Sequence, residues 1–286
     1  MVSISAYYLL RNRHLEFSRA SLKIGLAFAT VACVLQMISA DFTAKGVVRN
    51  QPVKLAALEG VYETRPDTPM TLFGYVDAGE QKVVGPKVPG LLSFLAWGSF
   101  TKPVVGLREL PSDEFLKLRH PQAAAGELPE IRKQYWPNVP AVFQFYHIMI
   151  IVGVGLLALS LVACFFWWRG WLFDLSFPLT RWLLVALVFS VLGLQIANQA
   201  GWFAAEMGRQ PWIVYEMLRT SESLSKVVTA NQIVASLILF GFVYSLLFVM
   251  FVFLLTRKIQ HGPDSQDESE EMPESWKALV RTTPRA

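Results

Sequence analysis

Four long apolar runs divide this chain and set the strongest limit on its fold. The first covers residues 20–41, and the others cover about 139–168, 180–205 and 228–256. Each run is long enough to cross a bilayer, which takes roughly 20 helical residues. Hydrophobic residues make up 53% of the chain, more than is usual for a soluble domain. The sequence therefore predicts an all-α, polytopic transmembrane helix bundle.

The stretch between the first two runs has a different character. Residues 42–138 are rich in proline, glycine and charge, and they contain no apolar run of spanning length. We expect a large extramembrane loop there. The predicted organisation has four parts: 1–41, the end of one membrane helix, a basic cytoplasmic turn and the first full span; 42–138, the outer loop; 139–256, three further transmembrane helices; 257–286, a polar cytoplasmic tail with an acidic run.

Basic residues near the span ends predict the orientation. The cluster from Arg11 to Lys23, the loop from Arg169 to Arg181 and the pair Arg257-Lys258 fall on one side if the four spans alternate. Short positively charged loops stay in the cytoplasm, so the large loop faces outward. The net charge of +4 is modest, and we expect no nucleic-acid partner.

The outer loop begins with a lysine and a glutamate that could do proton chemistry. Lys54 and Glu59 follow the first span within a stretch that can form a helix. Near a membrane surface, such a pair could bind the oxygens of a quinol and take the protons that its oxidation releases. The alternative is an exposed, weakly coupled pair on an amphipathic helix.

The second apolar run opens with two residues that can bind a metal. Met149 carries a thioether, a soft ligand suited to one axial position of a low-spin heme, and Gly153 at i+4 would leave room for a flat macrocycle. His147 is the other candidate ligand, but it faces away from Met149 on a helix. Simple packing is the alternative for the methionine.

A polar stripe marks the end of the third run. On a helix, Trp202, Glu206 and Arg209 share one face, which Asn198 and Gln195 extend inward. Glu206 could bind a high-spin heme iron or relay protons, and Arg209 could pair with a heme propionate. A helix-end ion pair beside an interfacial tryptophan is the alternative. Polar side chains in an apolar helix indicate a functional site.

Three motifs give the chain its resemblance to a known family. They are Gln51-Pro-x-Lys54-x-Ala-Ala-x-Glu59, the segment Phe145-x-x-x-Met149, and Gly201-Trp202-x-x-Ala-Glu206-x-Gly208-Arg209-Gln210-Pro211-Trp212. Together they resemble subunit I of the cytochrome bd-type quinol oxidases. The resemblance covers essentially the whole chain but only the carboxy-terminal half of the family's subunit, and the loop resembles that of members with a compact quinol loop.

The resemblance implies a role for each candidate residue. Lys54 and Glu59 match loop residues of quinol binding and oxidation. Met149 matches an axial ligand of the low-spin heme b iron, and Glu206 the residue at the high-spin heme b iron. Arg209 matches an arginine of the heme site, and Trp202 a tryptophan near the heme pair. His147 departs from the family pattern, because better-known members have arginine there.

The resemblance also implies the function and its requirements. We expect part of a terminal respiratory oxidase, a quinol:oxygen oxidoreductase of the bacterial inner membrane that reduces oxygen to water. Its cofactors would be low-spin heme b, high-spin heme b, and heme d or a b-type heme in its place. Its partners would be the upstream half of subunit I, oxidase subunit II, a small single-span subunit, and membrane lipid. The upstream half would carry the remaining histidine ligands, so we expect no activity without it. The alternative is a non-catalytic membrane subunit for quinone binding or complex assembly.

Overall fold

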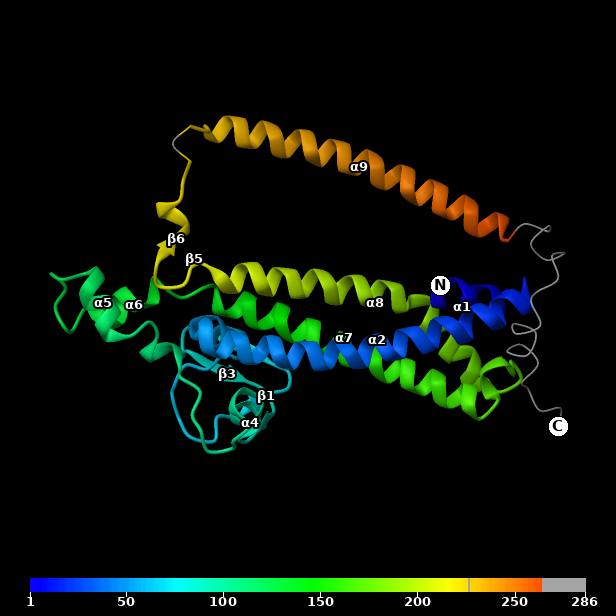
Figure 1. The fold of residues 1–286 in the computed structure, drawn as a ribbon, viewed down its shortest axis with the longest axis horizontal. Coiled ribbons are helices and arrows are strands. Elements are labelled where there is room, and N and C mark those ends of the chain that lie inside the picture. Colours follow the sequence, from blue (N-terminus) through cyan, green and yellow to red (C-terminus); the bar gives the residue numbers. More distant parts are fainter. Residues whose placement is uncertain (226, 264–286) are drawn as a thin grey trace. The chain divides into compact units, whose positions relative to one another are not determined.

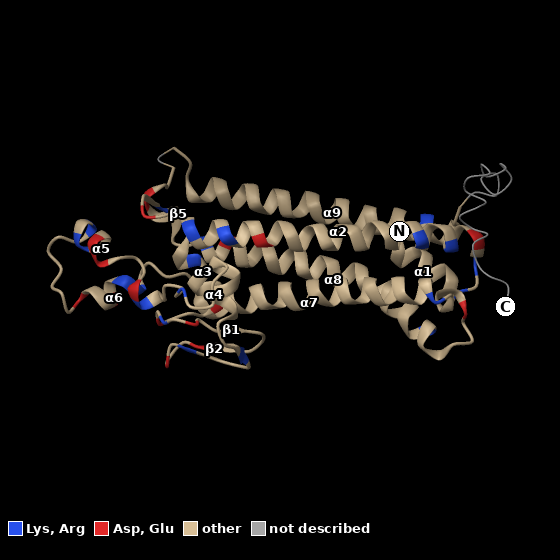
Figure 2. Ribbon diagram, turned by 60° about the horizontal axis from the view of Figure 1, so that its bottom comes forward, with Lys and Arg blue, Asp and Glu red and all other residues tan. Residues whose placement is uncertain are grey.

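Long helices dominate the computed structural model, which describes residues 1–225 and 227–263. Within those ranges, four helices are long and apolar enough to cross a membrane: α2 (Leu15–Asn50), α7 (Val139–Trp168), α8 (Pro178–Arg209) and α9 (Ala230–His261). Charged residues lie mainly toward the ends of these helices (Figure 2). The predicted polytopic all-α membrane fold is confirmed. The acidic run predicted in the tail falls outside the described residues.

The chain divides into two compact units. The first consists of Met1–Val31, Ala158–Val191 and the segment from Ser225 onward. It holds α1 (Val2–Leu10), the beginnings of α2 and α8, the end of α7, the short helix η2 (Trp171–Phe173) and α9. Buried leucines such as Leu22, Leu26 and Leu184 form its core. Side-chain hydrogen bonds add to the packing: Ser5 donates to Ser21, and Tyr8 donates to the Ile259 carbonyl at the end of α9.

The second unit consists of Ala32–Leu157 and Leu192–Leu224 and contains the predicted outer loop. Its short helices are α3 (Pro52–Glu59), α4 (Leu91–Trp97), η1 (Leu107–Glu109), α5 (Asp113–Arg119), α6 (Leu128–Lys133) and η3 (Thr220–Glu222). Three antiparallel strand pairs join them: β1 (Met70–Thr71) with β4 (Lys87–Val88), β2 (Tyr75–Asp77) with β3 (Lys82–Val84), and β5 (Trp212–Val214) with β6 (Leu218–Arg219). Figure 1 shows β1, β3 and α4 grouped below the end of α2.

A proline separates α2 from α3. Pro52 lacks an amide hydrogen, so it cannot continue the hydrogen bonding of α2, but it fits the first position of a new helix. The next five residues, from Val53 to Ala57, are all apolar except Lys54, and those four apolar side chains are buried. This packing fixes α3 against the start of α7.

A close backbone approach holds the chain that follows α3. Gly106 lies so near the backbone of Tyr62 and Glu63 that an added Cβ would come within 2.6 Å of it. This closeness allows the amides of Leu107 and Arg108 to donate hydrogen bonds to the carbonyls of Val61 and Tyr62, at 2.9 and 3.0 Å. The segment beyond Glu59 is therefore fixed by η1.

In the second unit, α8 packs through small residues. Ala200, Ala204 and Gly208 recur at every fourth position and are buried. A Cβ on Gly208 would come within 3.3 Å of the side chains of Lys54 and Val142, so the α8 backbone lies close to both α3 and α7. Small residues at such spacing let helices approach closely in a membrane.

Candidate functional site

Glu59 ends α3 with its side chain buried, only 4% exposed. The chain turns at Gly60, whose left-handed conformation (φ 64°) ends the helix, and whose neighbours Val83 and Phe143 leave no room for a side chain. Tyr146 in α7 lies close enough to the Glu59 carboxyl to influence its acidity. The Oε2 atom has no hydrogen-bond partner among the described residues.

This burial changes the acidity of the carboxyl. Removal from water raises the pKa of Glu59 to about 7, and the nearby Tyr146, which favours the carboxylate, opposes the rise only in part. A carboxyl with such a pKa can take up and release a proton near neutral pH. Titratable groups perturbed in this way are concentrated at functional sites.

Glu59 forms part of the wall of a cavity of about 330 Å³. Two ion pairs border this cavity, one between Arg108 and Glu63 at 2.5 Å and one between Lys82 and Glu80. Small-molecule sites commonly enclose roughly 300–1,000 Å³, so the volume suits a small ring. The walls come from residues 59–63 and 80–83 together with Arg65, Thr68, Pro69, Thr71, Lys87 and Arg108.

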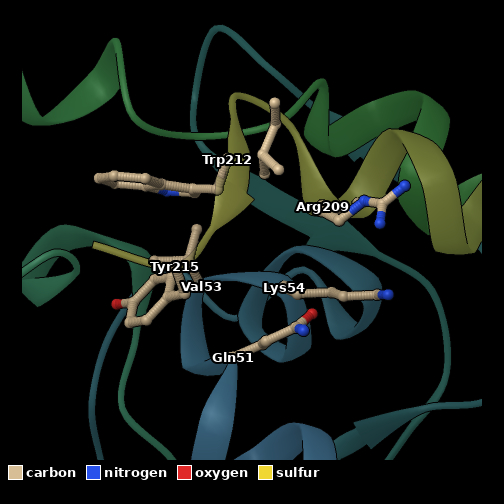
Figure 3. Close-up of a pocket in the computed structure, with 8 residues that line it drawn as sticks. Gln51, Val53, Lys54, Arg209, Trp212 and Tyr215 are labelled. Carbon is tan, nitrogen blue, oxygen red and sulfur yellow. The ribbon is translucent and has the colours of Figure 1, made fainter. Parts of the chain in front are cut away.

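Lys54 lies in a second, much smaller cavity of about 20 Å³, between α3 and the end of α8. Figure 3 shows its side chain pointing the same way as that of Arg209, with Trp212 and Tyr215 at the other end of the cavity. Burial lowers the pKa of Lys54, the nearby Arg209 guanidinium lowers it further, and Glu206 opposes both. The space holds about one water molecule.

The structure does not bring Lys54 and Glu59 together in one cavity. Each lines a different cavity, because the five-residue separation on α3 turns their side chains to different sides of the helix. Lys54 joins Glu206 and Arg209, whereas Glu59 joins Tyr146. The residues predicted from the loop therefore belong to two neighbouring groups.

Met149 packs against α8. A Cβ added to Gly201 would lie 2.7 Å from the Met149 sulfur, so the glycine makes room for the thioether. One turn further along α7, a Cβ on Gly153 would meet nothing within 4 Å. The α7 surface at Gly153 is therefore open among the described residues.

His147 links the loop to α7. Its side chain is 2% exposed, with Nδ1 2.9 Å from the Phe143 carbonyl and Nε2 3.0 Å from the Thr71 carbonyl. Because both ring nitrogens lie within hydrogen-bond distance of carbonyl oxygens, neither nitrogen is directed toward a metal. This histidine holds β1 against α7.

Glu206 and Arg209 bond to each other at the end of α8, i and i+3 apart, and both side chains are partly exposed. Trp202 is 57% exposed and lies beside Phe203, with ring centroids 5.2 Å apart. Gln195 and Asn198 are also exposed. Within the second unit, the stripe therefore lies on the exposed face of α8, opposite its buried small residues.

The family model for cytochrome bd terminal oxidase subunit I matches residues 1–263. The chain belongs to this family. It is 30% identical over 277 residues to the cytochrome bd ubiquinol oxidase subunit 1 of Bacillus subtilis (strain 168), covering 96% of the chain and 55% of that protein. The cytochrome bd-II ubiquinol oxidase subunit 1 of Escherichia coli (strain K12) is 29% identical over 316 residues, with coverage of 94% and 60%.

A solved structure supports the same relationship. The bd oxidase from Geobacillus thermodenitrificans matches with a TM-score of 0.73 and 26% identity, over 92% of this chain and 54% of that one. The chain thus spans somewhat more than half the length of these relatives. The resemblance to the bd oxidase subunit I family, inferred from the three motifs, is confirmed.

The hemes expected for a bd oxidase subunit I can be tested against the donors present. Met149 offers a thioether beside an open helix surface, which fits one axial ligand of a heme. Across residues 1–225 and 227–263, no three His, Cys, Asp or Glu side chains gather as a metal site. The described residues fit one side of a heme rather than a complete ligand set.

Two residues of this bd-family site were missed from the sequence alone. The sequence places Tyr146 in the second apolar run and Gly201 in the third motif, and it predicts a contact partner for neither residue. The signals were available: Tyr146 lies three residues before Met149 on the same helical face, and Gly201 lies on the same face as Ala204 and Gly208. Their partners, Glu59 and Met149, could be recognised only from the tertiary structure.

Proposed function

We propose that this chain is part of a terminal respiratory oxidase of the bacterial cytoplasmic membrane, which oxidises quinol and reduces oxygen to water. Membership of the bd oxidase subunit I family supports the reaction class. The relatives from Bacillus subtilis and Escherichia coli are described as ubiquinol oxidases. The outer loop, residues 42–138, is the proposed quinol-binding part, on the periplasmic side.

The buried Glu59 carboxyl carries this proposal. Oxidation of a quinol to a quinone releases two protons, and a base beside the substrate must accept them. Glu59 has an oxygen without a hydrogen-bond partner among the described residues and a pKa of about 7, and it lines a cavity large enough for a quinol ring. We assign proton acceptance to Glu59.

Lys54 has a different proposed role. It lies with Arg209 and Glu206, and burial together with the neighbouring guanidinium lowers its pKa. We therefore expect Lys54 to act through the charge balance of this group rather than as a second base in the Glu59 cavity. Loss of the Lys54 charge should weaken quinol oxidation because it disturbs the charge balance with Arg209 and Glu206 at the end of α8.

The proposed heme residues follow from the same family assignment. Met149 would bind low-spin heme b through its thioether, and Glu206 would lie at high-spin heme b, with heme d or a further b-type heme as the third cofactor. Bound heme supplies one-electron transfer between quinol and oxygen. Arg209 would pair with a propionate, which requires its ion pair with Glu206 to open, and Trp202 would pack near the heme pair. Oxidase subunit II, an upstream half of subunit I and a small single-span subunit are the proposed partners.

A matched pair of carboxamide variants tests the function. In membranes that contain the assembled oxidase, Glu59→Gln should lower quinol-dependent oxygen uptake by at least about 100-fold while the heme spectrum persists. Glu130→Gln is the control, because Glu130 is an exposed carboxylate of α6 paired with Lys133. Unchanged activity in Glu59→Gln would overturn the role of Glu59. If the unaltered complex consumes no oxygen with quinol, a non-catalytic membrane subunit becomes the better description.

A further inference from the structure

Arg108 connects three segments that line the Glu59 cavity. It lies in η1, where its Nη1 atom pairs with Glu63 Oε1 at 2.5 Å and its Nε atom donates to Gln81 Oε1 at 3.4 Å. Glu63 belongs to the segment that follows α3, and Gln81 to the turn between β2 and β3. Because all three residues line the cavity, the guanidinium lies at its wall.

The backbone of Arg108 is held on both sides. Its amide donates a hydrogen bond of 3.0 Å to the Tyr62 carbonyl, and its carbonyl accepts a hydrogen bond from the Arg132 guanidinium. Arg132 is itself 9% exposed, pairs with Asp113 and donates to the Pro111 carbonyl. The side chain of Arg108 therefore starts from a fixed position beside the cavity.

One donor group of this guanidinium remains available. Within residues 1–225 and 227–263, the Nη2 atom of Arg108 donates to no acceptor. Arginine presents its donors in a rigid planar fork, so contacts at Nη1 and Nε also fix the N–H bonds of Nη2. An oxygen of a ring bound in the cavity can accept one of these hydrogen bonds.

Proton transfer from a quinol to Glu59 requires a positive charge of this kind. A phenolic hydroxyl has a pKa of about 10, whereas the pKa of Glu59 is about 7. The transfer is therefore unfavourable by about 3 pKa units unless the quinolate anion that forms is stabilised. An opposite charge nearby lowers the pKa of an acidic group by about 1–3 units. One fixed cation in the cavity can thus remove most of the difference.

The other cations that line the cavity are less suited to this role. Lys82 pairs with Glu80 of the adjoining turn. Arg65 and Lys87 are exposed, and neither forms an ion pair within the part of the chain that the structure describes. No ion pair fixes the position of their charges, whereas a preorganised charge stabilises a developing anion most effectively.

We propose that Arg108 is a catalytic residue of quinol oxidation, whose Nη2 binds a quinol oxygen and stabilises the quinolate anion while Glu59 accepts the proton. This inference rests on the proposed function of Glu59. In the step, the quinol O–H bond breaks, its electron pair stays on the quinol oxygen, and a new O–H bond forms on the Glu59 carboxylate. No electron leaves the ring in this step.

Arg108→Gln in the assembled oxidase is the direct test, because it removes the charge and keeps a polar side chain. The kcat of quinol-dependent oxygen uptake should fall about 100-fold with a smaller rise in KM, since the anion forms only during the reaction. Arg108→Lys keeps the charge and should retain kcat within about tenfold of the wild type. The heme difference spectrum should stay unchanged in both variants.

Glu63→Gln distinguishes a catalytic charge from a structural ion pair. It removes the carboxylate that partly cancels the charge of Arg108 and leaves the guanidinium in the cavity wall. We therefore expect kcat/KM to rise, by about threefold, in the direction opposite to Arg108→Gln. If Glu63→Gln instead lowers kcat/KM as much as Arg108→Gln does, the ion pair is structural and the catalytic role is overturned.

Arg119→Gln is the matched control. Arg119 in α5 also forms an exposed ion pair, with Glu222, but it does not line the Glu59 cavity. This variant should retain both kcat and KM. Equal losses in Arg119→Gln and Arg108→Gln would indicate general destabilisation and would overturn the proposal, as would loss of the heme spectrum in Arg108→Gln.

Glu59→Gln separates this inference from the proposed function. If Glu59→Gln is inactive while Arg108→Gln keeps normal kcat and KM, the role of Arg108 is refuted and that of Glu59 stands. If Glu59→Gln is fully active, the proton acceptor lies elsewhere and both assignments fail.

Discussion

The sulfur of Met149 lies directly against the backbone of Gly201, with room for no Cβ between them. The thioether therefore fills the space beside Gly201, between α7 and α8. A larger residue at position 201 would displace Met149 or separate the helices. Gly201 thus controls the position of a proposed heme ligand without carrying any functional group.

Gly201→Ala should disturb the low-spin heme specifically. The new Cβ would lie 2.7 Å from the Met149 sulfur, so the flexible methionine side chain must move away from its present position. We expect a reduced or shifted low-spin heme b band in the reduced-minus-oxidised spectrum. Gly241→Ala in α9 is the control, because a Cβ there meets nothing within 4 Å. Equal spectra for both variants would rule out this control of Met149 by Gly201.

Met149→Leu should remove the thioether while nearly preserving side-chain volume. Thioether ligation raises the potential of a low-spin heme, so its loss should lower that potential or abolish the low-spin band. Redox titration of the purified complex measures the change. Met250→Leu, at an exposed position of α9, should leave the spectrum unaltered. A normal band and potential in Met149→Leu would exclude methionine ligation.

Glu59 should make the protein less stable as the pH rises. Its folded-state pKa, about 7, exceeds the ordinary 4.5, so the folded protein binds more protons than the unfolded chain between these values. Stability is greatest below this window, falls as the pH rises through it, and above about pH 7 the cost amounts to about 3 kcal/mol. Thermal unfolding in detergent should show this loss in the wild type but not in Glu59→Gln. The Glu130→Gln control should behave like the wild type.

Lys54→Met should lower quinol oxidation and leave the hemes bound. The substitution keeps the apolar stem beside Gly208 and removes the charge that faces Arg209 and Glu206. We expect a loss of about tenfold in kcat/KM, measured by oxygen uptake with a short-chain quinol. Lys117→Met, on the exposed surface of α5, is the control. Disappearance of the heme spectrum in Lys54→Met would instead make Lys54 a structural residue.

The spans could be predicted from the sequence because lipid imposes one simple requirement. A membrane helix must be apolar over its full crossing length, and the three later helices begin and end near the predicted limits. The first helix shows the limit of this reasoning. Residues 20–41 were expected as a span, whereas α2 continues to Asn50, because Lys45 and Asp41 form an i,i+4 ion pair and no proline intervenes before Pro52. Helix ends and membrane boundaries are separate properties.

The sequence predicts which residues belong to the candidate site, but it does not predict how they are arranged in space. Lys54 and Glu59 were selected together because both lie near the membrane in one short segment. The fold separates them, because helical pitch turns them to different sides of α3, and α7 and α8 approach those sides with different residues. The spacing of two residues predicts that they face different sides of α3. It does not identify the distant helix that packs against each of those sides. Tyr146 and Gly201 became visible for that reason only in the tertiary structure.

The contacts of His147 with the Phe143 and Thr71 carbonyls hold one side of the Glu59 cavity in place. Thr71, on that wall, is held to α7 through the imidazole, so it cannot swing outward unless a buried contact breaks. The turn from Glu80 to Lys82 also lines the cavity; its ion pair is exposed, and Gln81 accepts a hydrogen bond of 3.4 Å from Arg108. A substrate that enters this cavity should therefore shift the exposed β2–β3 turn more easily than Thr71, which contacts a buried imidazole.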